Sequence, residues 1–169
     1  MAMNGVEQLC PNCGLCCDST LFADVELQKG DDAARLKKLG LTLHQKTKTK
    51  TAFAQPCACF DGKLCRIYAD RPSRCRKFDC GLLKRVDAGE MTAGAALKKI
   101  SEAKRQTEQV RELLRSLGQC DERMALTHRY SEAMSQPIDL SDETGAERHG
   151  ELMLAVNDLM TRLQRNFLR

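Results

Sequence analysis

The chain is poor in the residues from which large apolar cores are built. Its 169 residues include five Phe, two Tyr and no Trp, so aromatic residues make up only 4% of the sequence. It has no run of 18 or more apolar residues, which excludes a membrane-spanning helix. The first ten residues show neither the basic nor the apolar region of a secretory signal. We therefore expect a cytoplasmic protein with no membrane segment, of one ordinary domain or a small domain with an extension.

No excess of one charge dominates the chain, since its formal net charge is only +4. One stretch, residues 29–50, holds seven Lys or Arg and two Asp and is locally basic. A solvated edge strand explains it, because lysines on an edge block aggregation of sheets. A nucleic-acid contact is the alternative, but only Phe22 and Phe53 lie near enough to stack on bases and no binding motif is present. Nucleic acid is therefore not an expected partner, and the sequence names no protein partner, substrate or oligomeric state.

Cysteine is the residue in which the chain is rich. There are ten, and nine of them lie in the first 80 residues, with only Cys120 beyond. In a chain that stays in the cytosol, cysteines at this density indicate metal binding. A disulfide framework is the alternative if the chain is exported. The first half of the chain is thus expected to be stabilised through sulfur.

Local patterns predict an irregular first half. We expect a strand over residues 20–27, a short helix between 31 and 40, a β-hairpin over 57–68 that turns at Asp61-Gly62, and a helix capped by Asp70 and ended by Gly81. The fold class is therefore α+β. Residues 1–86 form a small, irregular cysteine-rich metal module with a β-hairpin.

The second half of the chain is predicted to be helical. An apolar stripe repeats at helical spacing from residue 97 to residue 117, and Gly118 ends that helix. A shorter helix follows over residues 122–135. A last helix begins at Ser141 or Asp142, and its apolar residues are Leu152, Val156, Leu159, Leu163 and Phe167. Residues 87–169 are thus a helical extension of two or three helices packed on the metal module, with self-association through these stripes as the alternative.

The first cysteine cluster has the spacing of a metal site. Its four cysteines follow the pattern Cys10-x2-Cys13-x2-Cys16-Cys17. Two-residue spacing lets both thiolates of a turn reach one ion, as in zinc sites, and it also matches the start of the bacterial ferredoxin run. The spacing does not choose between zinc and iron. Because neighbouring side chains diverge, Cys16 and Cys17 favour two or more ions, or one larger cluster, over a single ion.

The second cluster contains Cys57, Cys59, Cys65, Cys75 and Cys80. In an ideal hairpin Cys57 and Cys59 share one face and Cys65 points to the other. Cys75 and Cys80 are five residues apart, which is roughly 140° of rotation on a continuous helix. A shared ligand role therefore requires that the helix end between them.

These two clusters together resemble a known family. The segment Cys10-Pro-Asn-Cys-Gly-Leu-Cys-Cys17, followed by Cys57 and by Cys65-Arg-Ile-Tyr-Ala-Asp-Arg-Pro-Ser-Arg-Cys75-Arg-Lys-Phe-Asp-Cys80, is similar to the zinc- or iron-chelating CxxCxxCC proteins (YkgJ-like). The resemblance covers residues 10–17 and 57–80. It implies eight metal ligands: Cys10, Cys13, Cys16, Cys17, Cys57, Cys65, Cys75 and Cys80. Cys59 and Cys120 stand outside the pattern and are expected not to be ligands.

The resemblance implies metal chelation, while the biochemical role of the family is largely unassigned. We expect a cytosolic cysteine-cluster protein that holds two or more zinc or iron ions through these eight thiolates. The alternative is an iron-dependent or iron–sulfur redox or radical enzyme, or an electron carrier, that uses the same cysteines. Flagellin lysine methylases share the pattern, but they are much longer chains, and this sequence shows no cofactor-binding motif. No catalytic residue is identified.

Other polar residues near the clusters have two interpretations each. Arg71 and Arg76 either partly neutralise thiolates or are surface charges. Asp18 is either a ligand or hydrogen-bond acceptor of the site, or it is a turn former. The three histidines are far apart and are interpreted as surface residues or as residues with local partners: His44, His128 and His149.

Overall fold

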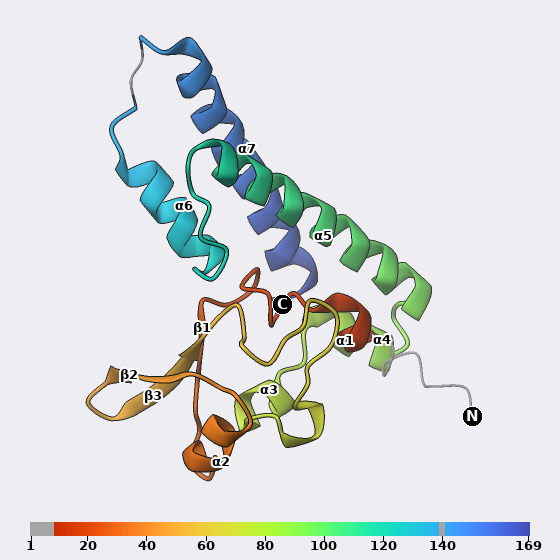
Figure 1. Ribbon diagram of the computed structural model, residues 1–169. Coiled ribbons are helices and arrows are strands. Elements are labelled where there is room, and N and C mark those ends of the chain that lie inside the picture. Colours follow the sequence, from red (N-terminus) through yellow and green to blue (C-terminus); the bar gives the residue numbers. More distant parts are fainter. Residues whose placement is uncertain (1–8, 139–140) are drawn as a thin grey trace.

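The structure is a computed structural model, which describes residues 9–138 and 141–169 (Figure 1). A three-stranded sheet lies in the first half of the chain and the long helices lie in the second. This confirms the predicted α+β class. The elements are α1 (Leu9–Cys13), β1 (Asp24–Glu26), α2 (Ala33–Lys38), β2 (Leu43–Thr47), β3 (Lys50–Ala54), the 3-10 helix η1 (Tyr68–Asp70), α3 (Ser73–Lys77), α4 (Gly81–Asp87), α5 (Ala93–Ser116), α6 (Leu126–Ser135) and α7 (Glu143–Asn166).

The sheet is antiparallel and has the order β1-β3-β2. Phe53 on the central strand pairs with Val25 of β1 and with Leu43 of β2. Strand β2 is therefore an exposed edge, as predicted for the basic stretch. The Lys46 ammonium pairs with Asp24 at 2.8 Å and with Glu26 at 3.2 Å, so its charge is neutralised within the sheet. The strand predicted over 20–27 is confirmed only for the three residues of β1.

The β-hairpin of this half is formed by β2 and β3, and the prediction of a hairpin over 57–68 is wrong. In that segment only Phe60 and Cys65 form a bridge, without a ladder. The Asp61 carboxylate accepts hydrogen bonds from the backbone N–H groups of Lys63, at 2.9 Å, and Leu64, at 2.7 Å. These two hydrogen bonds stabilise a four-residue loop between Phe60 and Cys65. A two-residue hairpin loop therefore does not form.

The short helix between 31 and 40 is confirmed as α2, but the single helix predicted up to Gly81 is wrong. The chain forms η1 and then α3, and α3 ends where Phe78 becomes extended. Gly81 begins α4 and does not end a helix. Asp70 pairs with Arg35 at 2.5 Å instead of capping α3. Helix α3 does end between Cys75 and Cys80, which a shared ligand role of these two cysteines would require.

The three predicted helices of the second half are present as α5, α6 and α7. Helix α5 starts at Thr92, whose hydroxyl accepts from the Ala95 N–H at 3.2 Å, and it stops at Gly118, which has a left-handed φ of 82°. Helices α5 and α7 lie side by side (Figure 1). The predicted stripes are the packed faces, since these residues are buried: Ile100, Ala103, Thr107, Val110, Leu114, Leu152, Leu159, Leu163 and Phe167.

Two apolar cores organise the molecule. The main core contains the packed faces of α5 and α7, and it also includes Leu9, Leu15 and Leu82 from the first half of the chain. The second core lies under the sheet and consists of Val25, Leu36, Leu41, Phe53, Cys57, Cys59 and Ile67. Residues from both predicted parts, 1–86 and 87–169, therefore contribute to the main core. The division of the chain into these two parts stays a prediction. No helix in the described part of the chain is long and apolar enough to cross a membrane.

Candidate metal centre

The first cysteine cluster begins on α1 and continues into a tight turn. Cys10 and Cys13 are three residues apart on the helix and therefore lie on one side of it. The Leu15 N–H donates to the Cys13 sulfur. The Leu15 side chain is completely buried in the main core, and the Cys17 N–H donates to the Gly14 carbonyl at 2.8 Å. The sequence folds this way locally because Gly14 adopts a left-handed φ of 76°, which closes the turn.

The loop after Cys17 is fixed by the long helices. The Asp18 carboxylate accepts from Arg111 of α5 at 3.1 Å, and the Asp18 carbonyl accepts from the same guanidinium at 3.0 Å. Asp18 also accepts from the Thr20 N–H at 2.9 Å. These bonds support the interpretation of Asp18 as a turn former. Arg111 was not recognised from the sequence as a residue of this site, since nothing in its spacing links it to the cysteines.

The second cluster packs directly on the end of the first. The Cys57 N–H donates to the Cys17 carbonyl at 2.8 Å, which places these two residues side by side. The Cys59 N–H donates to the Cys57 sulfur. The backbone bridge between Phe60 and Cys65 brings Cys65 beside Phe60, three residues after Cys57. Cys17, Cys57 and Cys65 therefore lie around the same core although 48 positions separate the first from the last.

Cys75 reaches this group through α3. The Asp31 carboxylate accepts from the Ser73 N–H at 2.8 Å and from the Ser73 hydroxyl at 2.7 Å, and it also accepts from the Gln28 N–H at 2.8 Å. Burial alone would raise the pKa of Asp31, but these hydrogen bonds lower it below its ordinary value. Asp31 thus anchors the first turn of α3, and Cys75 packs against the second core. From the sequence, Asp31 was interpreted only as part of a helix start.

Replacing Asp31 by Ala should therefore weaken the position of Cys75. Three hydrogen bonds to a charged acceptor are lost, and we expect a cost of about 1–2 kcal/mol in unfolding free energy together with weaker metal binding. Urea unfolding and metal titration of the variant measure both effects. Asp121→Ala is the matched control, since that carboxylate accepts from Arg123, two residues away in a local loop. Equal metal affinity in the two variants would contradict the anchoring role.

Cys80 lies apart from Cys75 and packs on the main core. It is the N-cap residue of α4, and the following Gly81 N–H donates to the Phe167 carbonyl at 2.9 Å. Cys13 packs against the same core. The last turn of α7 therefore sets the position of Cys80, and Figure 1 shows that the C-terminus lies beside α1 and α4. No sequence pattern around Cys80 indicates this contact.

The two cysteines outside the motif have local partners. Cys59 is completely buried, and its thiol donates to the Leu39 carbonyl at 3.4 Å. Cys120 is exposed after α5, and its thiol is 3.9 Å from the Arg115 carbonyl. All ten cysteines lie in the described part of the chain, and all carry free thiols. The non-ligand role of Cys59 and Cys120 stays a prediction.

Burial dominates the acidity of the motif thiols. It raises the pKa of Cys13, Cys17 and Cys57 to about 12 and that of Cys75 to about 11, and it also raises the pKa of Cys16. Charges of neighbouring cysteines raise these pKa values further. Several thiolates can therefore coexist here only beside a cation, and metal binding at neutral pH must release protons.

Arg71 lies near two of the motif thiols. After burial, which raises the pKa of Cys10 and Cys75, the charge of Arg71 lowers both. Its guanidinium also lies 3.6 Å from the centre of the Tyr68 ring. Arg76 instead approaches the Ser73 hydroxyl at 3.4 Å. These charges favour the neutralising interpretation of Arg71, whereas Arg76 contacts a residue of its own helix α3.

The donor set fits the metals that the sequence predicts. Thiolates suit zinc and iron–sulfur clusters, and backbone N–H groups already point at the sulfurs of Cys13 and Cys57. Among residues 9–138 and 141–169, no three His, Cys, Asp or Glu side chains are already close enough to hold one ion. The thiols must therefore converge further on binding. The three histidines lie on different elements: His44 on β2, His128 on α6 and His149 on α7.

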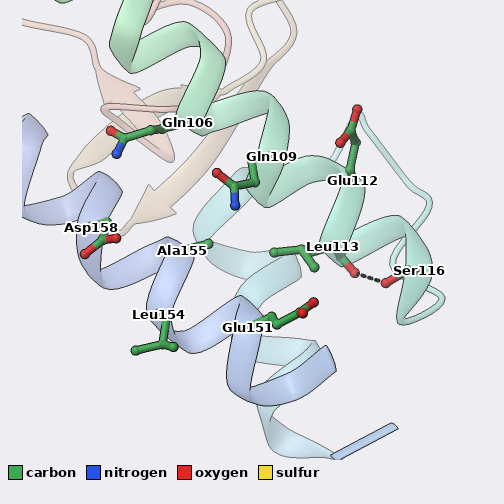
Figure 2. Close-up of a pocket in the computed structure, with 9 residues that line it drawn as sticks. All are labelled: Gln106, Gln109, Glu112, Leu113, Ser116, Glu151, Leu154, Ala155 and Asp158. Carbon is green, nitrogen blue, oxygen red and sulfur yellow. Dashed lines mark hydrogen bonds between the residues drawn. The ribbon is translucent and has the colours of Figure 1, made fainter. Parts of the chain in front are cut away.

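A cavity of about 480 Å³ lies away from the cysteines, between α5 and α7 (Figure 2). Gln106, Gln109 and Glu112 line it from α5, and Leu154 and Asp158 line it from α7. None of its lining residues is a cysteine or histidine. The cavity offers no donor set for a soft metal, so the cysteine clusters are the candidate site.

The chain belongs to the CxxCxxCC family, whose model is described as "Putative zinc- or iron-chelating domain" and matches residues 9–96. The match covers slightly more than half of the chain and includes both cysteine clusters. It confirms the predicted family, while the narrower YkgJ-like group stays a prediction. Searches of curated proteins and of solved structures gave no significant match. The family description supports zinc or iron as the metal and does not choose between them.

Proposed function

We propose that the protein binds zinc or iron through eight thiolates. The ligands are Cys10, Cys13, Cys16, Cys17, Cys57, Cys65, Cys75 and Cys80. The observation that carries this proposal is the convergence of distant cysteines, since Cys57 is hydrogen-bonded to Cys17 and Cys80 shares a core with Cys13. Membership of a zinc- or iron-chelating family supports the same conclusion.

Two or more ions are proposed for each chain. One tetrahedral zinc uses four ligands, so eight thiolates exceed the needs of one ion. The raised pKa values of the buried thiols support this count, because so many thiolates need more than one dication nearby. We also propose a cytosolic location, where free thiols persist.

An iron-dependent redox enzyme or electron carrier is the second candidate. The exposure of Cys10 favours it, because a metal held there would lie near the surface and within reach of a partner or substrate. An iron–sulfur protein absorbs visible light and is brown, whereas a zinc protein is colourless. The absorption spectrum of anaerobically purified protein separates the two candidates.

Metal analysis of three variants tests the proposal. The unaltered protein, purified without oxygen, should contain at least two metal ions per chain. Cys59→Ala and Cys120→Ala should keep that content, because their thiols bond to backbone carbonyls. Cys65→Ala should lose at least one ion. Thiol titration of the same samples counts the thiolates that are released.

Two results would contradict the proposal. The first is less than half an ion of every metal per chain in the unaltered protein. The second is metal loss in Cys59→Ala without metal loss in Cys65→Ala, which would exchange the roles of these two cysteines.

A further inference from the structure

The turn around Cys16 and Cys17 lies between the two apolar cores. Hydrogen bonds from the N–H groups of Cys17, at 2.8 Å, and Asp18, at 3.0 Å, both reach the Gly14 carbonyl. Within this short turn Leu15 is buried in the main core, while Cys17 packs against the second core. The backbone therefore crosses from one core to the other between Leu15 and Cys17, with Cys16 at the crossing point.

Four cysteines gather on the side of the second core. Cys57 is buried there, and Cys17, Cys65 and Cys75 pack against the same core. The hydrogen bond from Cys57 to Cys17, at 2.8 Å, and the pairing of Phe60 with Cys65 join three of them. Cys75 is supplied by α3.

Two of the remaining motif cysteines lie beside the main core. Cys13 of α1 and Cys80 at the start of α4 both pack against it. Cys10 lies one helical turn before Cys13, and Cys16 follows Cys13 by three residues. Two-residue spacing on either side of Cys13 would let Cys10 and Cys16 reach the ion that Cys13 binds.

From this packing we infer that the eight thiolates form two separate four-thiolate sites that interleave in the sequence. Site 1 consists of Cys10, Cys13, Cys16 and Cys80, and site 2 consists of Cys17, Cys57, Cys65 and Cys75. The last cysteine of the motif thus completes the site of the first cluster, and the fourth cysteine of the first cluster belongs to the second. This inference rests on the proposed function, since it divides the ligands of that metal binding.

Two double variants test the division, with cobalt(II) as the probe. In Cys13→Ala/Cys80→Ala both lost ligands come from site 1, so site 2 should keep one cobalt with the affinity and thiolate absorption of the unaltered protein. In Cys65→Ala/Cys80→Ala each site loses one ligand, so neither should keep these properties. Cys120→Ala is the control and should bind cobalt like the unaltered chain.

The opposite results would overturn the division. If the cysteines were grouped in sequence order, the variant lacking Cys65 and Cys80 would keep an intact site and the variant lacking Cys13 and Cys80 would not. Equal losses in both folded doubles indicate one common cluster and also overturn it. If the unaltered chain binds no zinc, iron or cobalt, the proposed function itself fails, which is a distinct result.

A measurement on the unaltered chain does not depend on the folding of variants. Metal-free protein is given one equivalent of zinc, free thiols are alkylated, and single molecules are read by top-down mass spectrometry. Each molecule with four protected motif cysteines should protect either the four of site 1 or the four of site 2. Protection of Cys16 together with Cys17, or of Cys75 together with Cys80, in the same four would overturn the division.

Discussion

Removal of the metal is expected to abolish amide-exchange protection from β1 to α3 while α5 and α7 stay protected. The second core is small, and two of its seven buried residues are the cysteines Cys57 and Cys59. The main core is twice as large and contains the packed faces of both long helices. The segment around the second core is therefore expected to depend most on bound metal.

The expected extent of unfolding follows from comparing the free energy of metal binding with the free energy of folding. Structural zinc contributes roughly 10–16 kcal/mol of apparent binding free energy in small peptides. The whole stability of a domain is about 5–15 kcal/mol. Loss of the metal should therefore unfold the smaller core outright. Chelation under reducing conditions, followed by hydrogen exchange and mass spectrometry, measures the change residue range by residue range.

Reloading is the control for this experiment. Addition of the same metal should restore protection between β1 and α3, which shows that the loss was not aggregation or oxidation. Persistent protection of β1, β3 and α3 in fully metal-free protein would mean that apolar packing alone folds this part of the chain.

The helices of the second half were predictable because their information is local. Apolar residues at helical spacing from Ile100 to Leu114 bury one continuous face, and the stop at Gly118 is read directly from the sequence. The same holds for the last helix, whose stripe ends at the buried Phe167. A long amphipathic segment of this kind is compatible with few secondary structures other than a helix.

The first half was less predictable because its structure depends on contacts between distant residues. The turn at Asp61 is a local exception, because the Asp61 side chain itself accepts two backbone N–H groups and excludes a two-residue hairpin. Gly81 starts a helix because the end of α7 lies against it, 85 positions further along the chain. Neither fact is visible in local spacing. The candidate ligands could be named from their motif, but the packing that brings Cys80 beside Cys13 could not.

The long helices are also part of the site. Arg111 of α5 holds Asp18, directly after Cys17, and the Ser19 hydroxyl accepts from the Leu126 N–H at the start of α6 at 3.2 Å. Ser19 has a left-handed φ of 76°, which a residue with a side chain adopts only when its surroundings hold it there. Changes in helix packing should therefore reach the cysteines, and Gly81 is the residue at which this can be tested best.

Gly81→Ala is expected to lower both the stability of the protein and the metal occupancy of the site that contains Cys80. A Cβ atom at residue 81 would lie 2.4 Å from the Arg169 carbonyl oxygen and 2.8 Å from that of Asn166. Both are backbone atoms, so no side-chain rotation relieves the overlap. The last turn of α7 must move away from α4, which breaks the hydrogen bond to Phe167 and disturbs those from Arg85 to Asn166.

Overpacking of this kind costs about 3 kcal/mol, which for a chain of this length lowers the melting temperature by roughly 6–12 °C. Gly94→Ala is the matched control, because Gly94 lies in α5 and an added Cβ would meet no described atom within 4 Å beyond its chain neighbours and its own helix backbone. That change should raise the stability by about 0.5–1 kcal/mol through helix propensity. Thermal melting and metal analysis of both variants provide the comparison. If Gly81→Ala melts like the unaltered protein and keeps its full metal content, the end of α7 does not position Cys80.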